Sequence, residues 1–321
     1  MATNDQSNNK SEAPVYGDRV ALWPKTIGQL TDRFGNTFNF GNCGEFWSCA
    51  FPIGSDIDYK THARNTRDME IRDSDILICA YPKTGYHWHD AIINMLVNKS
   101  AEHGKSRGNF LDPGLKMAEA APSPRIMCSH FPFRWVPQQA FMKKIKIIHI
   151  VRNPKDVAVS LFNHLNNHVG VLHMPGTFQQ FYHLFMEVGP YYGRYFDYLM
   201  DFQEGFESYP GVDVHTCVYE EMKADPVAGV MRLNEYLGTG CDAQLCADIA
   251  KACDFEVLRK VKDEAMPEGI KRLFKKDAPT FYRKGAVGDW KNWFTVAMNE
   301  EFEEEYKRCM KDYKIQFKWD M

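Results

Sequence analysis

Apolar residues between positions 75 and 165 recur first at the spacing of a strand and then at the spacing of a helix. Two short runs rich in β-branched residues, 75–80 and 144–151, predict buried strands. Each run is followed by apolar residues three and four positions apart, which predicts a helix with one buried face. These residues are Trp88, Ala91, Ile92, Met95 and Leu96 in the first unit, and Ala158, Leu161, Phe162 and Leu165 in the second.

The alternation of strands and helices continues along the chain. Residues 212–218 predict a third strand, and 225–237 and 243–262 predict helices. A C-terminal helix is indicated by apolar residues on one face, namely Met298, Phe302, Tyr306 and Cys309. This order favours a parallel sheet covered on both faces. We therefore predict an α/β fold: a single domain with a central parallel sheet flanked by helices.

Length and composition support one folded domain. The chain has 321 residues, of which 44% are hydrophobic and 25% charged, and this excludes a disordered chain. Its first residues are polar and lack the apolar stretch of a secretory signal. We expect a flexible tail over residues 1–35, a single domain over 36–321, and a cytoplasmic location.

Charge and cysteine content exclude several kinds of partner. The 39 Lys and Arg residues against 42 Asp and Glu residues leave a net charge of −3, which provides no long-range field for nucleic acid or an anionic membrane. No apolar run approaches the ~20 residues that span a bilayer. Nine cysteines without a CxxC pair favour reduced thiols over disulfides or a zinc site. Any anion site must be local, and we expect no metal.

Three basic loops are candidates for a local anion site. Residues 81–88 leave a strand and enter a helix, where unpaired backbone N–H groups attract phosphate or sulfate, and Lys83 adds a positive charge beside Gly85. The motif GxxxxGK[ST] is absent, which disfavours a P-loop ATPase. Arg152 follows the second strand, and a third cluster lies at 283–285. Singly, each could be an ordinary turn or a surface ion pair. Together they suggest a nucleotide that carries phosphates at two positions.

These segments resemble the signature blocks of the cytosolic sulfotransferases. The blocks are Tyr81-Pro-Lys-Thr-Gly85 with Trp88, the segment from Arg152 to Ser160, and the segment from Arg283 to Asn292. The resemblance extends over roughly residues 38–312. It implies a P-loop-like phosphosulfate-binding loop on a single α/β domain. It also implies transfer of a sulfuryl group, without a metal, from 3′-phosphoadenylyl sulfate (PAPS) to a hydroxyl or amine of a small organic acceptor.

The resemblance also implies roles for individual residues. His130 matches the general base that removes the proton of the acceptor, and Lys83 and Ser160 are further catalytic residues. The implied nucleotide-binding residues are Lys83, Thr84, Gly85, Tyr86, His87, Trp88, Arg152, Ser160, Tyr219, Cys253, Phe255, Leu258, Arg283, Lys284 and Gly285. Lys291 and Glu300 bound a segment that fits the family's dimer motif KxxxTVxxxE, so we expect a homodimer. The alternative is an ordinary entry to the C-terminal helix.

Several positions depart from the family pattern. Tyr86 and His87 stand where two threonines usually bind the 5′-phosphate. Cys128 stands where a lysine is common, which removes a positive charge near the transferred group. A protonated His87 would compensate, and turnover would then fall as the pH rises through its pKa. Cys253 replaces a threonine of the adenine pocket, which is a milder change.

Two histidines bear on the acceptor. His164 occupies a place that is often aromatic in the family's acceptor pocket, which indicates a more polar acceptor. His164 and His168 lie four residues apart and could ligate a metal, but no third ligand is evident, and two polar pocket or surface residues are the simpler interpretation.

Two alternatives to a sulfotransferase stay open. An alcohol dehydratase could use the same nucleotide site by way of a transient sulfate ester. A nucleotide-binding protein with lost activity would keep the site despite Tyr86, His87 and Cys128. The sequence does not identify the acceptor.

Overall fold

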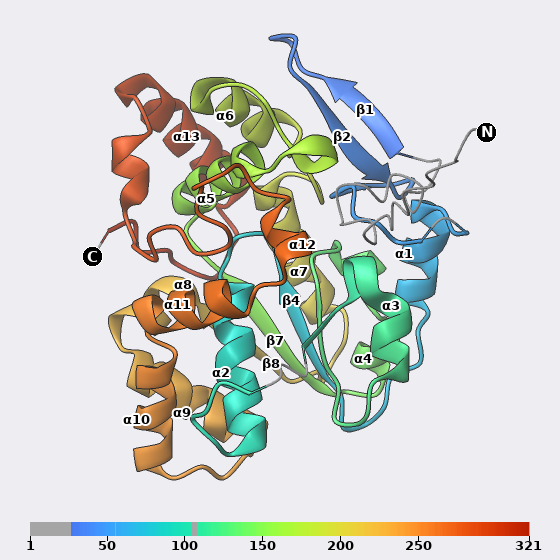
Figure 1. The fold of residues 1–321 in the computed structure, drawn as a ribbon, viewed down its shortest axis with the longest axis vertical. Coiled ribbons are helices and arrows are strands. Elements are labelled where there is room, and N and C mark those ends of the chain that lie inside the picture. The colour runs from blue at the N-terminus through green and yellow to red at the C-terminus, as the bar shows by residue number, and fades with distance from the viewer. Residues whose placement is uncertain (1–26, 55, 105–107, 321) are drawn as a thin grey trace, which may run out of the picture.

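A five-stranded parallel sheet forms the centre of the computed structural model, which describes residues 27–54, 56–104 and 108–320 (Figure 1). The strand order is β5-β6-β4-β7-β8, and every neighbouring pair is parallel. The strands are β4 (Ile76–Ala80), β5 (Gly108–Phe110), β6 (Ile126–Ser129), β7 (Lys146–Val151) and β8 (Val214–Val218). The predicted α/β class with a central parallel sheet is confirmed.

The sheet is buried on both faces because alternate residues of a strand enter different cores. In β4, Leu77 and Cys79 belong to one core, whereas Ile76, Ile78 and Ala80 belong to the other. Two-sided burial explains why this strand is an unbroken apolar run. Figure 1 shows α2, α9 and α10 grouped at the lower left of the sheet and α1, α3 and α4 grouped at its right.

The α-helices account for about half of the remaining described chain. They are α1 (Tyr59–Arg67), α2 (Tyr86–Asn98), α3 (Leu111–Ala120), α4 (Gln139–Met142), α5 (Pro154–Asn167), α6 (Phe178–Glu187), α7 (Tyr195–Glu207), α8 (Tyr219–Ala224), α9 (Pro226–Leu237), α10 (Ala243–Ala252), α11 (Phe255–Ala265), α12 (Glu268–Lys271) and α13 (Val296–Cys309). Short 3-10 helices are η2 (Phe133–Trp135), η3 (Gly170–Leu172) and η4 (Asp289–Asn292). Within the described ranges, no helix is both long and apolar enough to cross a membrane.

Two boundaries differ from the sequence predictions. The helix expected over 243–262 is two helices, because Asp254 starts α11 by accepting a hydrogen bond from the backbone of Glu256. The tail expected over 1–35 gives way to structure at Ile27, where β1 (Ile27–Thr31) begins. It pairs with β2 (Thr37–Asn42), which pairs with β3 (Trp47–Ser48), in an antiparallel sheet. Residues 1–26 lie outside the described ranges.

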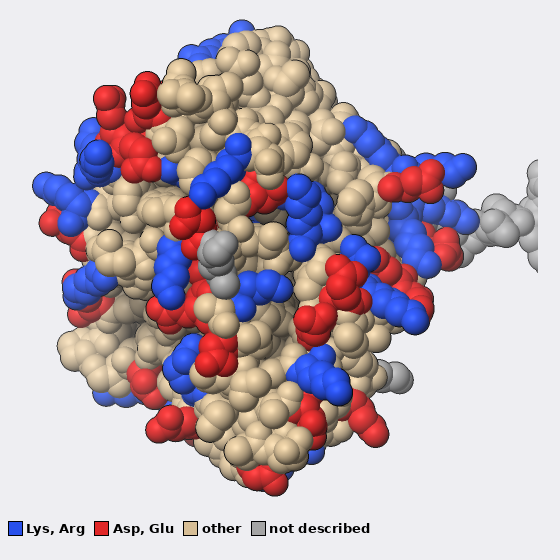
Figure 2. Space-filling model, turned by 90° about the vertical axis from the view of Figure 1, so that its left-hand side faces the viewer, with Lys and Arg blue, Asp and Glu red and all other residues tan. Residues whose placement is uncertain are grey.

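The topology brings the basic loops together. In a parallel sheet the carboxyl ends of all strands lie at one edge, where ligands of open α/β sheets bind. The loops after β4, β6 and β7 therefore share this edge. Elsewhere on the surface both signs of charge are mixed: Figure 2 shows Lys and Arg side chains interspersed with Asp and Glu over the face that lies at the left of Figure 1.

Candidate active site

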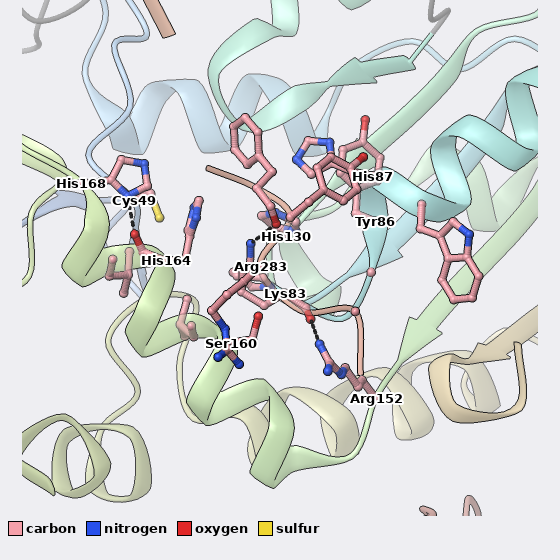
Figure 3. Close-up of a pocket in the computed structure, with 18 of the residues that line it drawn as sticks. Cys49, Lys83, Tyr86, His87, His130, Arg152, Ser160, His164, His168 and Arg283 are labelled. Carbon is pink, nitrogen blue, oxygen red and sulfur yellow. Dashed lines mark hydrogen bonds between the residues drawn. The ribbon is translucent and has the colours of Figure 1, made fainter. Parts of the chain in front are cut away.

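A cavity of about 380 Å³ lies at the carboxyl edge of the sheet (Figure 3). It gathers residues from all three basic loops and from the segment after β6. The expected residues that line it are Lys83, Gly85, Tyr86, His87, Trp88, His130, Arg152, Ser160, Tyr219, Phe255, Leu258, Arg283, Lys284 and Gly285. The expected residues that line this cavity therefore extend over the chain from Lys83 to Gly285.

Two expected nucleotide-binding residues point elsewhere. The hydroxyl of Thr84 donates to the carbonyl of Tyr81 at 2.8 Å and is buried inside the turn. The thiol of Cys253 lies 3.6 Å from the sulfur of Met95 in the core, and only its carbonyl reaches the site by accepting from the indole of Trp88 at 2.9 Å. The side chains of Thr84 and Cys253 therefore do not line the cavity, and the binding roles predicted for these two residues stay predictions.

The loop between β4 and α2 is shaped for close approach by a ligand. Lys83 and Gly85 have φ angles of 70° and 110°, in the left-handed region. A Cβ atom on Gly85 would lie 2.8 Å from the Tyr219 ring, so only glycine fits there. Gly85 is also the N-cap of α2 and provides no side-chain cap. The N–H groups of Trp88 and His89 already donate to the carbonyl of Gly85, which leaves those of Tyr86 and His87, at the start of the helix, to bind an anion.

The amino group of Lys83 has no anionic partner among the residues that the structure describes. Its Nζ donates to the carbonyl of Phe281 at 3.3 Å. Burial, reinforced by the nearby Arg152 and Arg283 guanidinium groups, lowers the pKa of Lys83 to about 7. A bound anion would offset each of these effects, because it supplies the missing opposite charge.

Arg152 joins two of the basic loops. Its guanidinium donates to the carbonyls of Lys83 at 3.3 Å and Ala286 at 3.0 Å, and it stacks 4.2 Å above the Tyr219 ring. The buried Nε of Arg152 has no hydrogen-bond partner among the described residues. A buried donor of this kind is costly unless a ligand accepts from it.

The third basic loop is held by an acidic side chain. Asp289 forms ion pairs with both Arg283 and Lys284. Burial alone would raise the pKa of Asp289, but hydrogen bonds from Lys284, Arg283 and Asn292 outweigh it and lower this pKa to about 2. A Cβ atom on Gly285 would lie 2.1 Å from the Phe255 ring, so this loop also packs closely against the wall of the cavity.

The ring of His130 is oriented as an acceptor of protons. Its Nδ1 hydrogen-bonds to the carbonyl oxygen of Ala80. Because a carbonyl oxygen only accepts, we assign the hydrogen to Nδ1, which leaves a lone pair on Nε2. Burial lowers the pKa of His130 to about 4, with Lys83 adding to the effect, so the free ring is neutral at pH 7. This is the protonation state that a general base requires.

Asp112 lies beneath His130 and was not singled out from the sequence. Its Oδ1 accepts hydrogen bonds from the Ser129 hydroxyl at 2.8 Å and from the backbone N–H of His130 at 3.2 Å. Burial raises the pKa of Asp112 to about 7. Because no motif connects it with His130, 18 residues away, only the fold reveals this support.

The departures from the family pattern have distinct structural outcomes. His87 retains accessible surface, yet surrounding protein and the charge of Lys83 lower its pKa. A protonated His87 in the complex therefore requires the bound nucleotide to raise this pKa, and the compensation stays a prediction. Tyr86 lines the cavity, with its ring 6.3 Å from that of His130. Cys128 is fully buried in the core behind the sheet, with Ile78 and Ile148 in the same cluster.

The remaining wall of the cavity is mostly apolar. It includes Phe51, Phe110, Leu172, Phe274 and Phe281, with His164 and His168 at one end. Such a wall suits a small organic molecule with a ring or an aliphatic skeleton. Within the described ranges, His, Cys, Asp and Glu form no group of three or more that could hold a metal ion, so His164 and His168 gain no third ligand.

Comparisons with known proteins agree with this arrangement. The family model "Sulfotransferase domain" matches residues 73–314. Sulfotransferase 1A1 of Rattus norvegicus is 31% identical over 264 residues, which cover 77% of this chain and 88% of the relative. The amine sulfotransferase of Oryctolagus cuniculus is 30% identical over 266 residues, which cover 79% and 86%.

Solved structures share the fold. The mouse sulfotransferase SULT7A1, complexed with PAP, superposes with a TM-score of 0.68 at 24% identity and covers 90% of this chain and 96% of its own. Retinol dehydratase, in a complex with retinol and PAP, superposes with a TM-score of 0.72 at 17% identity and covers 91% and 92%. At these identities the likeness shows the fold alone. The match of the family model over most of the chain, together with relatives that are 30% and 31% identical, shows that this chain belongs to the sulfotransferase family.

Proposed function

We propose that the protein transfers a sulfuryl group from PAPS to a hydroxyl, or an amine, of a small organic acceptor. The observation that carries the proposal is the convergence of three basic loops on one cavity with the neutral ring of His130. Family membership supports the reaction type. Two solved structures of the same fold contain PAP, and this supports the choice of nucleotide. PAP is 3′-phosphoadenosine 5′-phosphate, the product that remains when PAPS has lost its sulfuryl group.

The residues of the cavity suit the two phosphate groups of such a nucleotide. The loop around Lys83 and Gly85, with the N-terminus of α2, would hold the 5′-phosphosulfate. Arg152, Ser160 and the cluster Arg283, Lys284 and Gly285 would hold the 3′-phosphate. The unpartnered Nε of Arg152 and the depressed pKa of Lys83 are both relieved by an anion, which supports this fit. Trp88, Tyr219, Phe255 and Leu258 would contact the adenine.

In the proposed reaction the acceptor hydroxyl gives its proton to Nε2 of His130, and its oxygen forms a bond to sulfur. The bond between sulfur and the bridging phosphate oxygen breaks, and this oxygen keeps the electron pair. Lys83 stabilises the charge that develops on it. The negative charges of the nucleotide would also raise the pKa of His130 from its low value in the free protein, which makes the ring a stronger base in the complex.

Calorimetric titration with PAP, and with adenosine 5′-monophosphate as the control without a 3′-phosphate, tests the nucleotide site. Selective binding of PAP is expected. Transfer is then measured with PAPS and phenols, and His130→Ala should bind PAP as the wild type does but lose transfer by at least 100-fold. Absence of PAP binding to folded protein would refute the proposal. A product that lacks both hydroxyl and sulfate would identify a dehydratase instead.

We also propose that the protein is a cytoplasmic homodimer that pairs through the segment between Lys291 and Glu300. Val296, at the start of α13, has 77% of its surface exposed, which is unusual for valine and suits a partner contact. Sedimentation at micromolar concentration should show a dimer, and Val296→Asp should shift it to a monomer. A wild-type monomer under these conditions would contradict the proposal.

A further inference from the structure

His164 and His168 form a second polar end of the cavity. Figure 3 shows both rings on the side opposite Arg152. The rings are 4.5 Å apart, and the ring of His168 lies 4.4 Å from that of Phe274. Backbone hydrogen bonds on either side of Phe274, each 2.7 Å long, tie its segment to the end of α5. The imidazole of His168 is therefore held in place before any acceptor enters.

The hydrogen-bonding state of His168 follows from its contacts. Its Nδ1 lies 2.7 Å from the carbonyl oxygen of His164, so Nδ1 carries the hydrogen and Nε2 is an acceptor. No partner for Nε2 is present among the described residues. Burial lowers the pKa of His168 to about 4, which keeps the ring neutral at pH 7. Among the histidines that line the cavity, His130 and His168 share one arrangement: Nδ1 is bound to a backbone carbonyl, and Nε2 is left as an acceptor.

The charges around the cavity restrict what His168 can receive. Within the described ranges, the charged residues that line it are Lys83, Arg152, Lys223, Arg283 and Lys284, without a carboxylate. A buried ammonium group beside His168 would therefore find no counterion from the protein, because the phosphate groups of the nucleotide are held at the basic loops. An uncharged hydroxyl can donate to Nε2 without this cost.

We propose that the cavity selects uncharged acceptors that carry two hydroxyl groups on an apolar skeleton, one reacting at His130 and the other donating a hydrogen bond to Nε2 of His168. The inference rests on the proposed sulfotransferase function. Leu165, Leu172 and Leu273 line the cavity around this end and suit the apolar skeleton. A substrate without the second hydroxyl leaves Nε2 of His168 buried without a hydrogen-bond donor, and such a substrate binds more weakly.

Matched acceptors of two lengths test the inference with saturating PAPS. The longer probes are biphenyl-4-ol, biphenyl-4,4′-diol and 4′-methoxybiphenyl-4-ol. The shorter probes are 2-naphthol, naphthalene-2,6-diol and 6-methoxy-2-naphthol. In at least one set, the kcat/KM of the diol should exceed that of the mono-ol by ~5–10-fold, the effect of one net hydrogen bond. Two equivalent hydroxyl groups alone give twofold. The methoxy compound, which accepts but does not donate, should not exceed the mono-ol.

Variants assign the preference to His168. His168→Phe should reduce the diol-to-mono-ol ratio to about twofold, whereas His168→Gln, whose amide oxygen can accept, should keep more of it. His183→Phe, on the outer helix α6, is the matched control and should keep the full ratio. A wild-type ratio of twofold or less in both sets, or a full ratio in His168→Phe, would overturn the inference.

Failure of the inference and failure of the proposed function give different results. Wild-type protein that binds PAP and sulfates the mono-ols without preference for diols refutes the inference alone. Protein that binds no PAP and sulfates none of the six phenols refutes the proposed function, and the inference falls with it. PAP affinity of His168→Phe within threefold of wild type shows that the variant is folded. If that variant does not fold, the wild-type ratios decide.

Discussion

The pKa of Lys83 makes nucleotide affinity depend on pH. In the free protein, burial and the Arg152 and Arg283 guanidinium groups lower this pKa to about 7. A phosphate bound beside the amino group would raise it toward the ordinary value of ~10.4. Above pH 7, where Lys83 of the free protein has lost its proton, nucleotide binding must therefore be accompanied by uptake of a proton at Lys83. Affinity is greatest at or below pH 7 and falls as the pH rises.

The size of the effect follows from this pKa. Between pH 7 and pH 9 the protonated fraction of Lys83 in the free protein falls from about one half to about one hundredth, whereas the complex stays protonated. The affinity for PAP should therefore fall by about 50-fold, or ~2.3 kcal/mol. Ionisation of the phosphate groups, with pKa near ~6, is nearly complete at pH 7 and adds little.

Calorimetric titration with PAP at half-unit steps from pH 7 to 9 measures this slope. Repeating each point in two buffers with different ionisation enthalpies counts the protons taken up, and the count should rise toward one. Lys83→Met retains the length of the side chain and removes the titrating group, so it should bind more weakly but with a flat pH profile. The reasoning would be refuted if the affinity of the wild type for PAP changed by less than twofold over this range. It would also be refuted if the affinity of Lys83→Met fell with pH as steeply as that of the wild type.

Three further predictions concern the loop, the base support and the core. Gly85→Ala places a methyl group 2.8 Å from the Tyr219 ring at a φ of 110°, so PAP affinity measured by calorimetry should fall at least tenfold. Arg125→Met leaves the Asp75 carboxylate buried and unpaired, so urea denaturation should show a loss of ~3–5 kcal/mol with PAP contacts intact; a loss under 1 kcal/mol would contradict this. Because burial raises the pKa of Asp112 to about 7, ionisation costs the wild type stability as the pH rises from 4 to 7. Asp112→Asn has no carboxyl group to ionise and lacks this loss. The urea midpoint of the wild type, relative to that of the variant, should therefore be lower at pH 7.5 than at pH 4.5. A difference in midpoint that is the same at both pH values would contradict this prediction.

Burial on both faces made the central strands visible in the sequence. The apolar run of β4 is continuous, and that of β7 is broken after Lys146 only by His149, because both sides of each strand enter a core. By contrast, β1 is only half-buried and β5 has three residues, so neither produces a distinct pattern. The prediction of one helix over 243–262 failed because a single turn at Asp254 interrupts an otherwise helical composition.

The sequence by itself determined the fold class, the family and the residues of the three basic loops that line the cavity. Two of the basic loops follow strands, and a parallel sheet brings the ends of its strands to one edge, so the order of these two along the chain already implies that they meet. The third, at 283–285, follows α12 and no strand, so only the fold shows that it joins them. Only the tertiary structure decided the state of each group. The Nδ1 contacts of His130 and His168, the low pKa of Lys83 and the place of Asp112 depend on neighbours far apart in the sequence. Thr84 and Cys253 were excluded from the cavity for the same reason: side-chain direction and desolvation arise from packing, which local sequence does not encode.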